Sequence, residues 1–235
     1  MTPQMSFDTK LRPLGVPLHI HFSVVIILLL AVTALGVSVG LGLFVLISAS
    51  ILFHEYGHVL VAKRVGIGVR SVVFHGLGGA ANMDAPLCLY PPKDEIRVAL
   101  AGPAASAILA AASYPLYAMW PENFMLYYLF WVNALVGVFN LVPVFPLDGG
   151  RVLRGLLSIR KGPRKATKIA EITTYILASV VGAVSVAYGQ WLIAIIMGLS
   201  AYMAWQERTN TEKVMVMVED ELRREMVEKA ERYDN

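Results

Sequence analysis

Long apolar runs separated by short charged segments dominate the pattern along this chain. The runs predict six membrane-crossing helices, over residues 18–35, 40–62, 96–120, 124–142, 169–188 and 191–205. Several runs reach the roughly 20 residues that an α-helix needs to cross about 30 Å of hydrocarbon. The last run is shorter, and Trp191 and Trp205 at its ends are typical of aromatic anchors at a membrane interface. The pattern therefore predicts an all-α polytopic membrane protein with six transmembrane helices.

The basic residues are confined to a few segments that alternate with uncharged turns. All 20 Lys and Arg residues lie within residues 10–12, 63–97, 151–168 and 208–232. Six crossings would leave three turns without Lys or Arg on the opposite side, near residues 37–39, 121–123 and 189–190. Because basic loops favour the cytoplasmic side, we expect a multi-pass protein of the cell membrane with both termini in the cytoplasm. The first run is interpreted as a retained span, because it is too long for a signal peptide and no small-residue cleavage site follows it.

The composition supports a membrane protein and excludes several other classes. Apolar residues make up 57% of the 235 residues and charged residues 16%, against about 45–50% and about 25% in soluble domains. This excludes a disordered chain, and the single cysteine, Cys88, excludes an intrachain disulfide or a multi-cysteine metal site. The net charge of +3 resides in segments between apolar runs. We therefore expect a lipid bilayer as partner and no nucleic acid.

Two cytoplasmic segments are expected to have structure of their own. Residues 69–75 are rich in β-branched and aromatic side chains and precede a glycine-rich run, which predicts a short β-hairpin over residues 69–81. This hairpin either covers the helices or receives a substrate backbone as an added strand. The C-terminal segment alternates acidic and basic residues at helical spacing. We divide the chain into a six-helix membrane domain at residues 1–210 and a charged cytoplasmic tail at residues 211–235.

The candidate chemistry lies in the second predicted span, which contains His54-Glu55-Tyr56-Gly57-His58. Residues i and i+4 of a helix lie one turn apart on one face, so His54 and His58 can direct both imidazoles at one zinc ion. Glu55 is rotated by about 100° around the axis and can reach a metal-bound water as a general base. The alternative is a pair of packed histidines that bond to Glu55. A glutamate inside a span costs at least about 2.5 kcal/mol, which favours the metal site.

A zinc site of this kind needs a third protein ligand and an open position for water. Asp148 lies at the cytoplasmic end of the fourth predicted span, between prolines and a glycine pair that allow the segment to fold back into the protein. The residues alone support a metal ligand and an ordinary loop carboxylate paired with Arg151 equally.

A resemblance to a known family rests on four motifs in a fixed order. They are His54-Glu55-Tyr56-Gly57-His58, Gly78-Gly79-x-Ala81, Ala101-Gly102-Pro103 and Asn140-x-x-Pro143-x-x-Pro146-Leu147-Asp148-Gly149-Gly150-Arg151. Across residues 50–155 the chain resembles the site-2 protease family of intramembrane zinc metalloproteases, and its compact form is similar to minimal microbial, particularly archaeal, members. No PDZ insertion and no CBS domain are expected.

The resemblance implies a role for each candidate residue. His54, His58 and Asp148 are implied as ligands of one zinc ion, Glu55 as the catalytic acid and base, and Asn140 as a polar group near the substrate carbonyl. The implied activity is endopeptidase cleavage of transmembrane segments of substrate proteins, as in regulated intramembrane proteolysis.

Two other functions use similar residues. A membrane metal transporter or metallosensor could use the same ligands, since ionisable residues in spans mark ion pathways. These spans, however, contain few polar side chains along a path across the bilayer. A HExxH protease that acts on soluble or prenylated chains would require a later glutamate ligand, and no such motif is present. The histidines outside the motif (His19, His21 and His75) and Cys88 are expected to carry no catalytic role.

Overall fold

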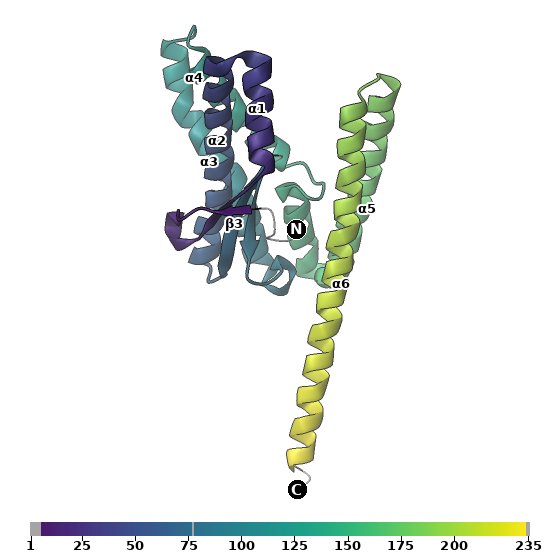
Figure 1. The fold of residues 1–235 in the computed structure, drawn as a ribbon. Coiled ribbons are helices and arrows are strands. Elements are labelled where there is room, and N and C mark those ends of the chain that lie inside the picture. Colours follow the sequence, from purple (N-terminus) through teal and green to yellow (C-terminus); the bar gives the residue numbers. More distant parts are fainter. Residues whose placement is uncertain (1–5, 77, 234–235) are drawn as a thin grey trace. The chain divides into compact units, whose positions relative to one another are not determined.

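The computed structural model describes residues 6–76 and 78–233. The chain divides into two compact units, Met1–Val142 and Pro143–Asn235. Among the described residues, the first unit holds four α-helices and a small sheet, and the second holds two long α-helices (Figure 1). The boundary predicted at residue 210 falls within the last helix.

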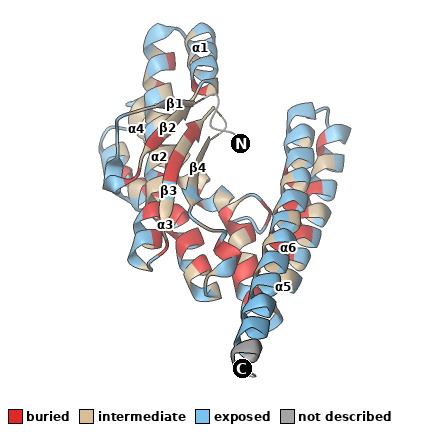
Figure 2. Cartoon of the chain, turned by 60° about the horizontal axis from the view of Figure 1, so that its bottom comes forward, coloured by how far each residue is buried: buried red, intermediate tan, exposed pale blue. Residues whose placement is uncertain are grey.

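The helices of the first unit are α1 (Ser23–Leu35), α2 (Val37–Arg64), α3 (Pro92–Met119) and α4 (Phe124–Asn140). The predictions of helices over 40–62, 96–120 and 124–142 are confirmed, with ends that differ by a few residues. α2 and α3 are long and apolar enough to cross a membrane, whereas α1 and α4 are shorter apolar helices. Figure 2 shows that α1 is largely exposed, and its exposed side chains are mostly apolar, among them Val25, Leu29 and Leu30.

The prediction that a helix begins at residue 18 is wrong. Leu18–His21 forms strand β2, and the helix starts only at Ser23. β2 pairs in parallel with β3 (Val69–His75), in a register that places Leu18 opposite Val72. The strand that pairs with β2 lies some fifty residues later in the chain. The local apolar pattern therefore does not distinguish β2 from the start of a helix. His19 and His21 accordingly lie in a strand rather than at the start of a span.

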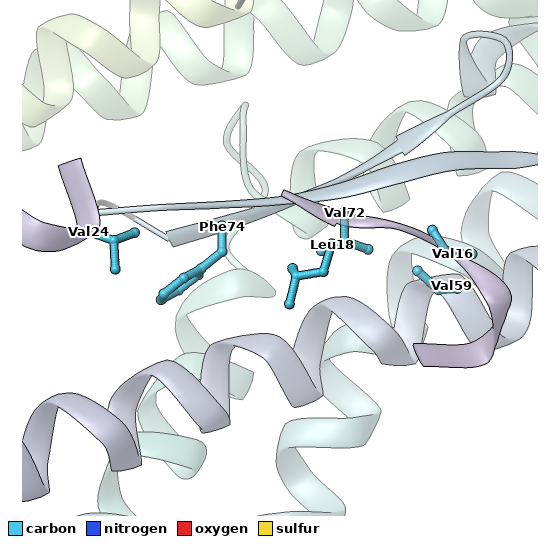
Figure 3. Close-up of a cluster of buried hydrophobic side chains, with 6 residues drawn as sticks. All are labelled: Val16, Leu18, Val24, Val59, Val72 and Phe74. Atoms are coloured by element: carbon cyan, nitrogen blue, oxygen red, sulfur yellow. The ribbon is translucent and has the colours of Figure 1, made fainter. Parts of the chain in front are cut away.

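The sheet has four strands in the order β1-β2-β3-β4, with β1 at Ser6–Asp8 and β4 at Gly78–Met83. β3 and β4 pair antiparallel, so the segment predicted as a short hairpin forms two strands of this larger sheet. Leu18, Val72 and Phe74 of the sheet pack with Val24 and Val59 of the helices in a buried cluster (Figure 3). This cluster holds the sheet against α1 and α2, which explains why so small a sheet is stable.

The contact between α2 and α3 depends on small residues. A Cβ atom at Gly57 would lie 2.7 Å from the Ala101 carbonyl oxygen and 2.8 Å from the Ala105 Cβ atom. Glycine therefore lets the two backbones approach closely, as small residues do between helices in membranes. This close approach brings the histidine face of α2 directly against α3.

The second unit consists of α5 (Asp148–Ala187) and α6 (Trp191–Tyr233), which lie side by side. The helix predicted over 169–188 lies within α5 except for its last residue, and the helix predicted over 191–205 lies within α6. α5 is interrupted at Gly162, whose φ of 74° separates two helical segments. The second half of α5 is apolar enough to cross a membrane, and many of its large apolar side chains are exposed. Such a surface suits lipid rather than water.

Candidate metal centre

The two histidines of the second predicted span lie together on the buried face of α2. His54 is 3% exposed and His58 4% exposed. Their Nε2 atoms are 3.3 Å apart. This spacing suits an N–H···N hydrogen bond between the rings when one Nε2 carries the proton, and it suits equally a cation shared by the two nitrogens.

The Nδ1 atoms of both rings are held by α3. His58 Nδ1 donates a hydrogen bond to the Val98 carbonyl oxygen at 2.6 Å, and a carbonyl can only accept. His58 Nε2 therefore carries a lone pair when the ring is neutral. His54 Nδ1 lies 2.9 Å from the Ser106 hydroxyl oxygen, an arrangement that allows the same tautomer. A partner on one ring nitrogen that leaves the other free for a metal is typical of ligand histidines.

The spacing of the Nε2 atoms fits zinc. Two Zn–N bonds of about 2.0–2.1 Å at a tetrahedral angle place the nitrogens about 3.3 Å apart. Space in front of both rings depends on Gly102 of α3, where a Cβ atom would lie 2.2 Å from His58 Nε2 and 2.5 Å from His54 Nε2. The residues present thus fit a metal ion that approaches the histidine pair.

Glu55 leaves α2 in a different direction and is held by the sheet. Its Oε2 atom accepts a hydrogen bond from the backbone N–H of Ala81 in β4, at 3.0 Å. A Cβ atom at Gly79 would lie 2.5 Å from Glu55 Cγ, so glycine is required there. Glu55 is half-buried and ionisable, and β4 fixes its orientation beside the histidine pair. The Gly78-Gly79-x-Ala81 run therefore leaves room for the Glu55 side chain and supplies the backbone N–H that bonds to its carboxylate.

His75 of β3 is a nearby titratable group that lies outside the spans. Its pKa is lowered by burial and by His21, and Glu55 partly opposes this effect. His21 itself bonds through Nδ1 to the Ser23 hydroxyl at 2.8 Å. Cys88 is buried in the short 3-10 helix Leu87–Leu89.

Asp148 belongs to the second unit, where it is the first residue of α5 and is buried. The helix dipole stabilises a negative charge at this end. The preceding turn is tight, because a Cβ atom at Gly150 would lie 2.8 Å from the Phe145 backbone nitrogen. The prolines and glycines of the motif thus build a turn that ends in a buried carboxylate. The Asp148 carboxylate supplies an oxygen donor of the kind that zinc accepts.

Asn140, the last residue of α4, is half-buried, and its Nδ2 atom donates to the Val136 carbonyl oxygen of the same helix at 2.9 Å. Two residues of α3 beside the histidine rings were not predicted: Ser106 was not identified, and Gly102 was noted only within the Ala101-Gly102-Pro103 motif. Their spacing of four residues on one helix face was the available signal. A second missed bridge joins α4 to α2, where buried Asn133 Nδ2 donates to Ser50 Oγ at 2.9 Å.

Comparisons with known proteins agree with the geometry. The model of Peptidase family M50 matches residues 42–124 and 122–184. A zinc metalloprotease of Methanocaldococcus jannaschii is 32% identical over 174 residues, which are 71% of this chain and 50% of the relative. Rip3 of Mycobacterium tuberculosis, also named as a zinc metalloprotease, is 38% identical over 125 residues, which are 50% of this chain and 31% of that protein.

A solved structure is similar over most of the chain. The site-2 protease from Methanocaldococcus jannaschii matches with a TM-score of 0.68 and 28% identity, and the match covers 86% of this chain and 95% of that one. The chain spans about half the length of the first curated relative and about a third of the second.

Proposed function

The chain belongs to Peptidase family M50, and we propose that it is a zinc endopeptidase of the site-2 type that cleaves transmembrane segments of substrate proteins within the bilayer. The observation that carries this proposal is the pair of Nε2 atoms 3.3 Å apart on a helix apolar enough to cross a membrane. A hydrolytic centre at this depth suits a substrate that is itself embedded in lipid.

One zinc ion would be held by His54, His58 and Asp148. These residues are all buried and supply the nitrogen and oxygen donors that zinc prefers while leaving a fourth position for water. Bound zinc supplies Lewis-acid chemistry, since it polarises a carbonyl oxygen and lowers the pKa of its water. The protein supplies the orientation of the rings through Val98 and Ser106.

Glu55 acts as the general base and then as the general acid. Its carboxylate accepts the proton of the attacking water and delivers it to the leaving amine. The Ala81 N–H keeps one oxygen engaged, which leaves the other for the water. Asn140 would donate a hydrogen bond to the substrate carbonyl once the substrate displaces its bond to Val136.

The six helices would form a multi-pass membrane protein with both termini in the cytoplasm. Three helices (α2, α3 and α5) have the length and apolarity to cross, and the turns without Lys or Arg support the orientation. His54 precedes Lys63 by nine residues, so the zinc would lie about 13 Å inside the cytoplasmic boundary. Water must therefore reach it by a polar path from that side.

The substrate backbone would pair with β4. Among the described strands β4 lies at the edge of the sheet, and its Ala81 N–H already points away from β3 toward Glu55. An unwound segment in lipid needs backbone partners, and a strand edge provides them. In a Cys88→Ser background, cysteine at Ala80 should form a disulfide with a cysteine near the scissile bond of the substrate. Phe7→Cys in β1 is the control, because Phe7 is exposed on another strand. Equal disulfide formation with the substrate at both positions would indicate that β4 only covers the helices.

The central test is Glu55→Gln. We expect cleavage of a transmembrane substrate in detergent to fall by at least about 100-fold, while the zinc content remains that of the wild type because Glu55 is no ligand. Glu122→Gln, an exposed glutamate between α3 and α4, is the matched control and should retain activity. Full activity of Glu55→Gln would refute the mechanism. A zinc flux assay in proteoliposomes tests the transporter alternative, which the comparisons do not favour.

A further inference from the structure

We propose that Arg154 of α5 and Glu207 of α6 are positioning residues for the metal ligand Asp148, and that they act through Phe145. The inference rests on the proposed function, because it takes Asp148 as a zinc ligand. All of the contacts that carry it lie within the second unit.

Phe145 is the anchor of the turn that leads to Asp148. It precedes Asp148 by three residues and is 2% exposed. Its backbone N–H donates to Thr174 Oγ1 at 3.0 Å, and its side chain packs with Ala170 and Ala204. The position of the turn is therefore set by contacts with α5 and α6 rather than by its own short sequence.

Arg154 also contacts the Phe145 ring. It follows Asp148 by six residues and is 2% exposed, an unusual burial for a guanidinium. Its Cζ atom lies 5.4 Å from the centre of the Phe145 ring, within the range of a cation–π interaction. A buried cation over this ring links the turn to the first segment of α5, which begins with Asp148.

Glu207 provides the negative partner of this buried cation. Arg154 Nη1 donates to Glu207 Oε1, and the two residues form an ion pair between α5 and α6. Burial acts to raise the pKa of Glu207, but Arg154 and Arg151 hold it below its ordinary value. Glu207 is therefore ionised at neutral pH. Removing the Glu207 charge would take this negative partner away from the buried cation, which favours a shift of Arg154 and of the ring beneath it.

The matched control is another ion pair between the same helices. Arg164 pairs with Glu219 at 2.7 Å and with Glu212 at 3.4 Å, but it has no described contact with the Phe145 turn. If these pairs serve only to join α5 and α6, Arg154 and Arg164 are equivalent. If the Arg154 pair positions the ligand, only the Arg154 pair affects metal binding.

The experiment compares zinc affinity by chelator competition, together with the absorption spectrum of the cobalt-substituted protein, for the full chain in detergent. The Arg154→Met and Glu207→Gln variants should bind zinc about 10- to 100-fold more weakly and show a changed cobalt spectrum. Arg154→Lys, which keeps the cation, should recover part of the affinity, and Arg164→Met should match the wild type. Glu207→Gln has the shape of the natural residue and tests the proposal even if Arg154→Met does not fold.

The Asp148→Ala variant separates a failure of the ligand assignment from a failure of the positioning role. Wild-type zinc affinity in Asp148→Ala would remove the ligand assignment on which the proposed function depends. Loss of zinc in Asp148→Ala, with wild-type affinity and spectrum in both Arg154→Met and Glu207→Gln, would overturn only the positioning role.

Discussion

The histidine pair and the aspartate turn are held by different kinds of interaction. The rings of His54 and His58 are oriented by a serine hydroxyl and a backbone carbonyl, in a space that a glycine leaves open. The turn before Asp148 is anchored by Phe145, whose backbone bonds to Thr174 and whose ring lies under the Arg154 guanidinium that pairs with Glu207. Neutral groups therefore orient the two histidine rings, whereas a buried ion pair packs on the aromatic ring that precedes Asp148.

The largest effect should come from closing the space in front of the histidines. In Gly102→Ala the added methyl group would overlap both Nε2 atoms, so zinc affinity should fall by more than about 100-fold. The loss would be measured by chelator competition on folded protein in detergent.

Gly198→Ala in α6 is the control, because a Cβ atom there would meet nothing within 4 Å. Zinc binding by Gly102→Ala with wild-type affinity would show that the metal does not approach the rings from α3.

A smaller effect is expected from the hydroxyl that orients His54. Ser106→Ala removes the hydrogen-bond partner of His54 Nδ1, so zinc affinity should weaken by about 10- to 100-fold. The packing of α2 against α3 should be unchanged. Ser113→Ala is matched, because Ser113 is also buried on α3 but donates to Ala110 of its own helix. Equal affinities of the two variants would mean that neutral hydrogen bonds do not position the histidines.

The smallest effect is expected on thermal stability, from the Arg154–Glu207 ion pair and its dependence on pH. The lowered pKa of Glu207 means that its ionised form stabilises the fold above its ordinary pKa, and that this stability is lost as the pH falls through the lowered value. At neutral pH, Glu207→Gln should therefore have a Tm about 2 °C lower than the wild type. Thermal unfolding in detergent at decreasing pH should show the difference shrink, and a constant difference would contradict the linkage.

The sequence predicted the helices and the metal-binding motif because both depend on local spacing. The i, i+4 placement of His54 and His58 follows from helix geometry alone. Strand β2 could not be predicted, because its identity depends on pairing with Val72 far along the chain. The contact of Glu55 with Ala81 was hidden for the same reason: it joins a helix to a strand that local patterns cannot place side by side.

The parallel pairing of β2 with β3 also imposes an order of assembly. The two strands are separated by α1 and α2, which turn at Gly36, so they can meet only after the chain has gone out along one helix and returned along the other. Closing so long a loop is slow compared with forming either helix. β4 can join the sheet only after β3, and β4 is the strand that orients Glu55. The backbone N–H that orients Glu55 therefore comes from a strand made after α2, so this carboxylate is held in place only once β3 and β4 have packed against that helix.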